Sequence, residues 1–526
     1  MAARAKRSST STATATRGRG SRTGQTSAPP TATTRRTAKA STSVYEAGSQ
    51  SRRAYGWHAP TVSPNTAILA NLATLRDRSR AATRNDGYAK GAIDELVSEL
   101  IGIGIKPMSR AEDVDLRKLL QRRWMYWTDE SDADGLLDWY GQQAQAVRAW
   151  LEGGECFVRM RSRLPIDGLS VPLQVQVLEP ELCPHTHHAI LPSGNRVRAG
   201  IEFNGIGKRV AYWFHPSRPG DWQDFDASQL RRVPADSVIH LYDPLRPGQL
   251  RGLPHLTPAL VFLHELAKLR DATLLREQLR NLFVAFLTHK ADGDETTHAL
   301  TGLTTETDAE GKPLLGLSPG LFQELSPGED VTFSKPPETG AAYSEFMRAN
   351  LRAVAAAVRV PYELLSGDMT GLNDRLVRVI LHKFRRRLQA WQHQIVAFQL
   401  CRPVWRAWLD RGFLSGTLPL PAKYVTEPAR VAAVKWSPQS WPYLHPVQDV
   451  EAQEQAIRSG FTSRAAVVSE QGEDAEEIDD QQGEDNARAD GKGLRYDSDG
   501  RQPKNGARTT GAPSPDENAP PPAAEQ

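Results

Sequence analysis

Four side chains able to bind a metal lie within six residues of one another: Cys183, His185, His187 and His188. Zinc sites usually take their ligands from two separated pairs of Cys or His residues. No second pair lies near this one in the sequence. We therefore interpret the segment as a histidine-rich hairpin tip and predict no metal site there.

A second candidate cation site is the acidic segment Glu-Ser-Asp-Ala-Asp-Gly at 130–135. Carboxylates at alternate positions before a glycine are typical of the first half of a calcium-binding loop. The twelfth position of such a loop needs a glutamate that binds with both oxygens, and here it is Gly141. The segment therefore favours an acidic turn before a helix over a calcium site.

Two enzyme classes are recognisable by short motifs that this sequence lacks. A phosphate-binding loop reads GxxxxGK[ST], but the Gly-Lys pairs that begin at 207, 311 and 491 lack both the upstream glycine and the following Ser or Thr. The zinc-protease motif HExxH does not occur either. We predict no ATP hydrolysis and assign no catalytic, cofactor-binding or metal-binding residue.

Residues 372–410 have helical spacing and predict one long helix, with Pro403 as a kink. One stripe of this helix is apolar and the other face is largely basic. A basic face is either solvated, as in an ordinary amphipathic helix, or turned toward phosphates, which it attracts without reading sequence. The spacing leaves both interpretations open. The apolar stripe is Leu376, Ile380, Phe384, Leu388, Trp391, Ile395 and Phe398, and the basic residues are Arg375, Arg378, His382, Arg385 and Arg386.

Composition indicates a large folded centre between two unfolded ends. The 526 residues are 39% hydrophobic, below the ~45–50% of a compact globular chain. The net charge of +3 conceals a basic block of +10 over 1–55 and an acidic block of about −9 over 470–490. Neither end can bury enough apolar surface to offset its chain entropy. We expect disordered tails at 1–58 and 471–526.

Cysteine usage and hydropathy bear on the compartment. The three cysteines are odd in number and far apart, which implies no disulfide framework and favours a reducing compartment. No stretch reaches the ~18 apolar residues needed to span a bilayer, and the N-terminus has no apolar signal segment. We expect no role within a membrane.

Between the tails, the periodicity predicts an α+β fold. A polar loop, GDMTGLND, occupies 367–374 before the long helix. Helices are predicted over 68–105 with a break at 85–87, over 113–128, 136–152, 255–288 and 341–358, with a last helical pair before the acidic tail. Strands are predicted over 155–161, 173–178, 196–203, 208–213 and 237–242, with a hairpin at Asn204-Gly205.

Several of these segments together resemble the lambda-type family of tailed-phage portal proteins, the head-tail connectors. The most specific are LYDPLRPGQLRG at 241–252 and VPYELLSGD at 360–368, the latter followed by a long basic helix. The resemblance covers about three quarters of the chain. Further stretches that carry it lie at 78–107, 133–161, 173–181, 238–260, 351–387 and 401–410.

This resemblance implies a portal fold and its regions. The fold would combine an α+β wing, a helical stem, a small α/β clip, a long kinked helix and a helical crown. The implied boundaries are 59–253 for the wing, 254–288 and 341–360 for the two stem helices, 289–340 for the clip, 361–374 for a tunnel loop, 375–411 for the long helix of the wing and 412–470 for the crown.

The resemblance also implies a function and its partners. Such proteins form rings, typically of twelve subunits, at one capsid vertex, where double-stranded DNA enters and leaves and a separate terminase hydrolyses ATP. The expected partners are further copies of the chain, DNA without sequence preference, the terminase large subunit, the major capsid protein or scaffold, and head-tail joining proteins. The expected location is the virion, and the bacterial host cytoplasm during assembly. Two alternatives are a nuclease-like DNA-processing phage enzyme and a monomeric DNA-binding scaffold.

The loop at 367–374 would line the channel. Its glycines allow backbone conformations that other residues rarely adopt, and short polar side chains suit weak, sequence-blind contact with a moving duplex. We expect carboxylates and arginines to balance, which leaves the lining close to neutral; a simple helix–helix connection is the alternative. The candidate DNA-channel residues are Gly367, Asp368, Met369, Thr370, Gly371, Asn373, Arg375 and Arg378, with Asp374 beside them.

Overall fold

The chain divides into two units, Met1–Thr61 and Val62–Gln526, and all the helices and strands named below belong to the second. The expected N-terminal tail and most of the expected clip lie outside the described residues. The computed structural model describes Gly56, residues 59–220, 226, 228–281, 285–289, 306–307, 313–314, 329–333, 342–441, 443, 445–496, 499 and 501.

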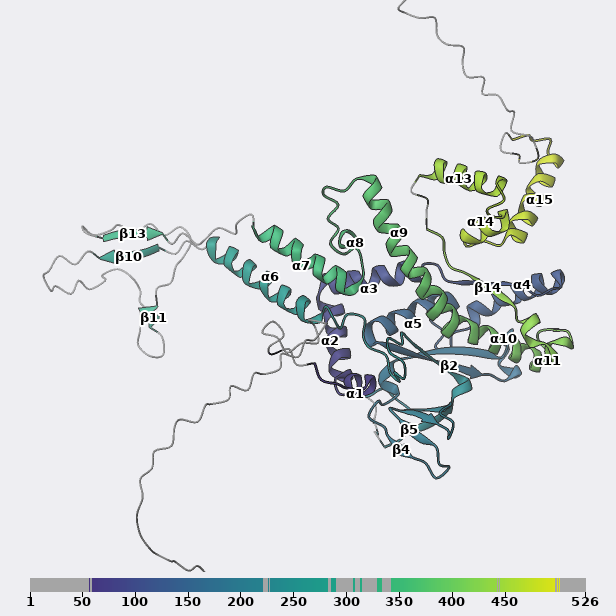
Figure 1. Ribbon diagram of the computed structural model, residues 1–526, viewed down its shortest axis with the longest axis horizontal. Helices are drawn as coiled ribbons and strands as arrows, with labels where there is room; N and C mark the ends of the chain where they lie inside the picture. The colour runs from purple at the N-terminus through teal and green to yellow at the C-terminus, as the bar shows by residue number, and fades with distance from the viewer. Residues whose placement is uncertain are drawn as a thin grey trace, which may run out of the picture. The chain divides into compact units, whose positions relative to one another are not determined.

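The predicted helical stretches at 68–105, 113–128 and 136–152 are confirmed as helices, except that the first ends at Leu100 (Figure 1). The break at 85–87 exists because the Asp86 carboxylate accepts hydrogen bonds from the N–H groups of Tyr88 and Ala89 at 2.9 and 3.0 Å, which begins a new helix. This helical layer consists of α1 (Pro64–Leu69), α2 (Leu72–Asn85), α3 (Gly87–Leu100), α4 (Val114–Glu130) and α5 (Trp139–Gly153).

A three-stranded antiparallel sheet follows α5 directly. Gly154 ends the helix in the left-handed conformation, with φ 88°, so that the chain enters β2 (Glu155–Ser162) at once. The strand order is β3-β2-β9, with β3 at Leu173–Leu178 and β9 at Val238–Tyr242. Each of these strands begins and ends within one residue of its prediction.

A second sheet contains five strands in the order β4-β5-β6-β7-β8. The hairpin at Asn204-Gly205 is confirmed, between β6 and β7. The strand predicted over 196–203 is wrong, because Ala199 and Gly200 have φ values of 51° and 78° and turn the chain between two short strands. The strands are β4 (Ala189–Ile190), β5 (Arg196–Arg198), β6 (Ile201–Phe203), β7 (Arg209–Phe214) and β8 (Arg231–Pro234).

The hydrophobic core of the described residues has two parts. The smaller one lies between the sheets and includes Phe157, Ile201 and Phe214. The larger one joins the three-stranded sheet to the helices and is centred on Trp124, whose ring centroid lies 4.8–6.4 Å from those of four other tryptophans. Those four are Trp127, Trp139, Trp405 and Trp408. Residues far apart in sequence therefore share one core.

A network of buried charges ties the two sheets to α2. The Glu155 carboxylate is fully buried and pairs with Arg76 and Arg251, which are also buried. It also receives the Gly252 N–H at 2.9 Å and lies 2.8 Å from His240 Nε2. Burial alone would raise the pKa of Glu155, but the two guanidinium groups and His240 outweigh it and hold that pKa well below its usual range.

The helix predicted over 255–288 is shorter than expected. It is α6, at Leu260–Asn281, and a strand, β10 (Ala285–His289), follows. The prediction is wrong at its C-terminal end because β10 pairs in antiparallel fashion with β13 (Glu329–Phe333), a partner about forty residues away. Two further short strands, β11 (Glu306–Thr307) and β12 (Pro313–Leu314), pair with each other. The helix predicted over 341–358 is confirmed as α7 (Ala342–Val358), which packs beside α6 (Figure 1).

The long helix predicted over 372–410 is interrupted. It consists of α9 (Asp374–Trp391), a π-helical segment at Gln392–Cys401, and α10 (Arg402–Ser415) with Pro403 in its first turn. The π-helical segment also contacts the sheet: the Gln399 side chain accepts the Tyr242 N–H and donates to the Tyr242 carbonyl, both at 3.1 Å. The irregularity expected at Pro403 therefore lies in the π-helical segment at 392–401, shortly before that proline.

The C-terminal part begins with α11 (Lys423–Thr426) and α12 (Pro428–Val431). Next comes β14 (Val434–Ser437), which pairs with β1 (Lys106–Ser109). The predicted helical pair is present as α13 (Pro446–Arg458) and α14 (Arg464–Glu470). The chain between α10 and α13 thus returns to the helical layer and adds a two-stranded sheet that the sequence did not predict.

The expectation of a disordered acidic tail from 471 onward is wrong at its beginning. Residues Ala475–Gly491 form a helix, α15, capped by the Asp474 carboxylate. Acidic residues in its first turn interact favourably with the helix dipole. Carboxylates of α15, and that of Glu473 just before it, pair with a basic surface that the sequence alone could not locate. These ion pairs are Lys106–Glu473 at 3.7 Å, Arg117–Glu476 at 2.8 Å, Lys118–Asp480 at 2.5 Å and Arg464–Asp479.

Reversing two of these charges, with Glu476→Lys and Asp480→Lys together, is expected to release α15 from α4. All four pairs are partly exposed, so they are individually weak and are screened by salt. Hydrogen–deuterium exchange of 475–491 should become faster in the variant, and also in the wild-type protein as salt is raised. The matched control is Glu477→Lys with Glu484→Lys, which changes the same charge at exposed positions. Equal exchange in both variants would contradict this role of the ion pairs.

Candidate DNA-channel site

The loop at 367–374 connects α8 (Tyr362–Ser366) to α9 (Figure 1). Gly367 ends α8 with φ 71°, and Gly371 has φ 75°. Both glycines thus occupy the left-handed region, as their positions in the sequence predict. The predicted tunnel-loop segment, 361–374, therefore consists of a short helix followed by a turn of seven residues or so.

Asp368 holds this turn together. Its carboxylate accepts hydrogen bonds from the Thr370 N–H at 3.1 Å and the Thr370 hydroxyl at 2.5 Å. The Tyr362 hydroxyl donates to the other carboxylate oxygen at 2.8 Å, and Arg348 of α7 pairs with that same oxygen at 2.9 Å. Arg348 also donates to the Thr370 hydroxyl at 3.2 Å. The loop is therefore anchored to α7, a contact that sequence reasoning missed.

The charge of Asp368 is compensated within the chain. Hydrogen bonds from Thr370 and Tyr362, together with the Arg348 guanidinium, hold the pKa of Asp368 well below its usual range. Asp368 therefore stays ionised, yet it faces a cation of the same chain. The other carboxylate of the loop, Asp374, lies 2.7 Å from His445 Nε2, at the beginning of α13. Both carboxylates of the loop thus lie beside a basic side chain.

The first turn of α9 presents positive charge to the solvent. Asn373 caps the helix by accepting the Leu376 N–H at 2.9 Å. Arg375 is exposed and Arg378 is half-buried. In the part of the chain that the structure describes, neither arginine makes an ion pair. With Asp368 compensated, the balance at the loop is positive and not close to neutral as expected.

The remaining basic residues of α9 do not all face outward. His382 and Arg386 are exposed, but the Arg385 guanidinium lies over the Trp441 ring, 5.3 Å from its centroid. Burial lowers the pKa of Arg385, with the Glu99 carboxylate opposing this effect. Arg385 thus belongs to the packing between α9 and the chain after β14, and the solvated basic face is smaller than the spacing suggested.

The predicted apolar stripe is confirmed in its centre and wrong at both ends. Phe384, Leu388, Trp391 and Ile395 are buried. Leu376, in the first turn of α9, is 48% exposed. Phe398 is 60% exposed, since the π-helical segment has more residues per turn and rotates this position away from the stripe.

The acidic segment at 130–135 forms the expected turn before α5. The Asp132 carboxylate accepts N–H groups of Asp134, Leu136 and Leu137 at 2.9–3.0 Å, and the Gln142 side chain at 2.9 Å. These donors occupy the oxygens that a cation would need. Asp132 thus organises the chain before α5.

The histidine-rich segment lies before β4 and packs against the second sheet. Cys183 is buried, as are the other two cysteines, and all three are free thiols. The His187 ring lies 5.6 Å from the Trp213 ring, and His188 Nδ1 accepts the Ala199 N–H at 3.4 Å. Within the described residues, no three Cys, His, Asp or Glu side chains converge as a metal site would require. No described helix has the length and apolar character to cross a membrane.

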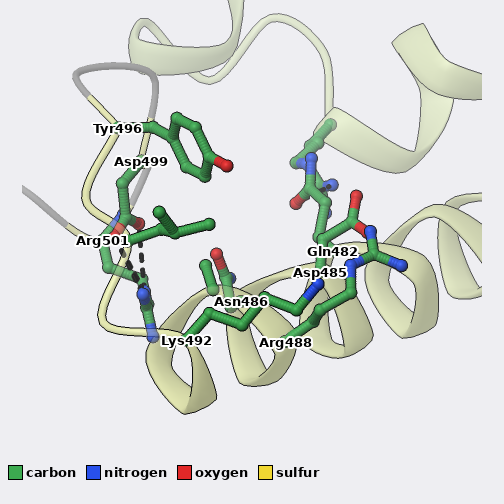
Figure 2. Close-up of a pocket in the computed structure, with 11 residues that line it drawn as sticks. Gln482, Asp485, Asn486, Arg488, Lys492, Tyr496, Asp499 and Arg501 are labelled. Atoms are coloured by element: carbon green, nitrogen blue, oxygen red, sulfur yellow. Dashed lines mark hydrogen bonds and ion pairs between the residues drawn. The ribbon is translucent and has the colours of Figure 1, made fainter.

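A polar cleft of about 880 Å³ lies between α15 and the chain that follows it. Figure 2 shows the Arg501 side chain beside Asp499, with dashed lines to the Asp499 carboxylate. Arg501 also pairs with Asp490, Arg488 with Asp485, and Arg464 with Asp479. Three of the four cations that line the cleft are thus paired with carboxylates of the same chain, and Lys492 is the fourth. The cleft is therefore a weaker candidate for phosphate binding than the α8–α9 loop.

Comparison with known proteins is consistent with this architecture. The family model described as "Phage portal protein, lambda family" matches residues 50–392, more than half of the chain. The chain therefore belongs to the lambda family of phage portal proteins, as its motifs indicated. It is thus a portal protein of the tailed-phage type, and the family is structural and not catalytic in character.

Individual relatives agree with the family match. The probable portal protein of Halomonas phage phiHAP-1 is 26% identical over 444 residues, covering 80% of this chain and 81% of that protein. The portal protein of Escherichia phage N15 is 22% identical over 468 residues, covering 81% and 86%, respectively. Portal protein B of Escherichia phage lambda is 20% identical, with the same coverage. Each relative is thus similar along most of its length.

Among solved structures, the chain is similar to components of gene transfer agent (GTA) particles. A chain from the neck of the empty GTA particle aligns at 16% identity with a TM-score of 0.42, covering 76% of this chain and 93% of that chain. A chain from the virion of the native particle aligns at 15% identity with the same TM-score, covering 78% and 99%, respectively.

Proposed function

We propose that this chain forms a closed ring of typically twelve copies at one vertex of the capsid, and that double-stranded DNA passes through the ring during packaging and ejection. Family membership supports the proposal, and closed rotational symmetry is the usual way in which one chain builds a ring. The ring would conduct DNA without chemistry of its own, and a separate terminase would hydrolyse ATP.

The charge balance at the α8–α9 loop is the observation that carries the DNA-conducting role. Arg375 and Arg378 lie next to a turn whose own carboxylate, Asp368, is already paired with Arg348. In a ring, each copy would add the same positive charge around the channel. Such charge attracts phosphates independently of sequence and in a salt-dependent way, which allows a duplex to slide past.

The regions of the family fold are proposed for this chain as follows. Residues 59–253 form the wing, α6 and α7 provide the stem, 289–340 form the clip, and 375–411 form the long helix behind the loop at 361–374. The described part after 412 forms the crown, and α15 belongs with it because of its pairing with Arg464 of α14. The candidate channel residues are Gly367, Asp368, Met369, Thr370, Gly371, Asn373, Arg375 and Arg378.

The proposed partners follow from the same role. The terminase large subunit and the head-tail joining proteins would dock on the ring, and the major capsid protein or scaffold would surround it. The protein would function in the virion and assemble in the host cytoplasm. No part of this role requires catalysis by the chain itself.

The mass of the purified particle tests the proposal. Twelve chains of 58.1 kDa give a ring of about 700 kDa, because closed symmetry fixes the number of copies. Light scattering and negative-stain images at near-physiological salt should show closed rings, and ATP turnover and nuclease activity should be absent. A stable monomer over a wide range of concentrations would favour a monomeric DNA-binding scaffold. Nuclease activity abolished by a point substitution in this chain would favour the enzyme alternative.

A further inference from the structure

A row of three arginines occupies one face of the three-stranded sheet. Side chains at alternate positions of β2 point to the same face, and on this face Glu155 and Phe157 are buried between the two sheets. Farther along, the same face carries Arg159 and Arg161, and Arg163 continues the series just past the end of β2. These three residues, the arginine row, are each half-buried.

Two glutamines of the neighbouring strand β3 hold the arginine row in place. Gln176 accepts the Arg161 Nε–H at 2.8 Å, and Gln174 accepts the Arg163 Nε–H at 2.7 Å. A neutral acceptor orients a guanidinium without neutralising it. Gln176 also accepts a terminal N–H of Arg161. The remaining terminal N–H groups of the arginines are available for a planar anionic group such as a carboxylate.

The positive charge of the arginine row is not compensated. Burial lowers the pKa of Arg161, and the nearby charges of Arg159 and Arg163 lower it further. The Asp134 carboxylate acts in the opposite direction. Within the described residues, no carboxylate forms an ion pair with any of the three arginines. Arg232 on β8, by contrast, pairs with Glu202 at 2.7 Å. Three like charges this close together destabilise the free protein, so an anion that binds them recovers this cost.

The surroundings of the arginine row are partly apolar. A shallow cleft of about 270 Å³ is lined by the row together with Val233, Pro234 and Ser237. Directly after Arg163, the chain exposes Leu164 (66%) and Ile166 (88%). The backbone of duplex DNA offers phosphates but no apolar side chains to such residues. An acidic peptide offers both carboxylates and apolar side chains.

We propose that the arginine row is a docking site for an extended acidic segment of a partner protein, with carboxylates at alternate positions and apolar residues beside them. Alternate residues of an extended chain repeat at about 6.6–6.8 Å, and the arginines of β2 have the same repeat. A segment lying along β2 can therefore pair one carboxylate with each arginine. This site is separate from the α8–α9 loop and does not depend on the channel role.

Fluorescence anisotropy with a labelled peptide tests the proposal on the full-length assembled protein. The probe is a nine-residue peptide with glutamate at every second position and valine or threonine between. The comparison probes are the same peptide with glutamine in place of glutamate, and a 20-base-pair duplex. The wild-type protein should bind the glutamate peptide at least tenfold more tightly than the glutamine peptide, and binding should weaken as salt is raised.

The test variant changes all three arginines of the row to glutamine and should lose at least tenfold in affinity for the glutamate peptide. The matched control is the triple variant Arg84→Gln, Arg122→Gln and Arg406→Gln, which removes the same charge from exposed positions on three helices. It should bind the peptide like the wild-type protein.

Hydrogen exchange of the wild-type protein provides a second measurement, which requires no variant. Exchange of residues 159–163 should become slower when the glutamate peptide is bound. Unchanged peptide binding in the test variant, or no protection of 159–163, would overturn the proposal. Duplex binding that is lost in the test variant, without binding of the glutamate peptide by the wild-type protein, would also overturn it and would assign the row to DNA.

Discussion

Replacing Glu155 with glutamine is expected to destabilise the folded chain by about 3–5 kcal/mol, the usual cost of breaking a buried ion pair by removal of one partner. Arg76 and Arg251 are buried and would then keep their positive charges without a carboxylate between them. Glutamine has nearly the same shape, so the loss reports on charge and not on packing. Thermal unfolding of the variant should begin at a clearly lower temperature.

The control for this change is Glu112→Gln. Glu112 also pairs with an arginine, Arg430, but its side chain is 70% exposed. Exposed pairs contribute little because water competes for both charges. The control should therefore unfold like the wild-type protein. If Glu155→Gln also unfolded like the wild-type protein, the buried network would not be what holds the two sheets and α2 together.

Acid is expected to weaken the same network through His240. Arg209 can only donate to His240 Nδ1, 3.3 Å away, so Nε2 carries the ring proton and donates to Glu155. Burial lowers the pKa of His240 to about 4, although Glu155 opposes this shift.

An unfolded histidine has a pKa of about 6.5, so between pH 6.5 and 4 the unfolded chain binds the proton more readily. Stability is therefore fully present above pH 6.5 and falls as the pH is lowered toward 4. Unfolding temperatures measured across this interval should fall less steeply for His240→Asn than for the wild-type protein. Parallel curves for the two proteins would contradict the role of His240.

Deleting residues 369–371 is expected to leave rings and empty capsids intact but to reduce DNA-filled heads by roughly tenfold, because every subunit of a symmetric ring loses the same loop. The deletion removes Thr370, which donates twice to Asp368. It also shortens the turn that precedes Arg375. Packaged DNA can be measured by the nuclease-resistant genome content of purified heads.

A matched control removes three exposed residues, 493–495, beyond the end of α15. Both deletions shorten the chain equally, but only the first lies beside the basic turn of α9. Heads built with the control should fill normally. If heads with the loop deletion also packaged and retained full-length genomes, the loop would be a simple connection between α8 and α9.

Local patterns predicted much of this fold because they act over short distances. β2 and β3 could be located from alternating side chains, and the break between α2 and α3 from Asp86, a capping residue. The turn at Ala199 could not be predicted, since alanine rarely adopts a positive φ. β10 could not be separated from α6, because what makes it a strand is its pairing with β13.

The candidate site shows the same division. The conformations of Gly367 and Gly371 and the cap at Asn373 follow from residue type and spacing. Arg348 carries no comparable signal, because it lies twenty residues before Asp368 on a different helix. The sequence therefore predicted where the loop bends, whereas its charge balance depends on which helix packs beside it.

The pairing of Gln399 with Tyr242 bears on how the protein avoids aggregation. β9 is an edge strand of its sheet, and a free strand edge can pair with the edge of another molecule. Here the outward N–H and C=O groups of Tyr242 are both bonded to one glutamine side chain. In the proposed ring, many identical chains would meet through chosen faces. The π-helical segment thus closes off, at Tyr242, an edge through which the same chains could stack without limit.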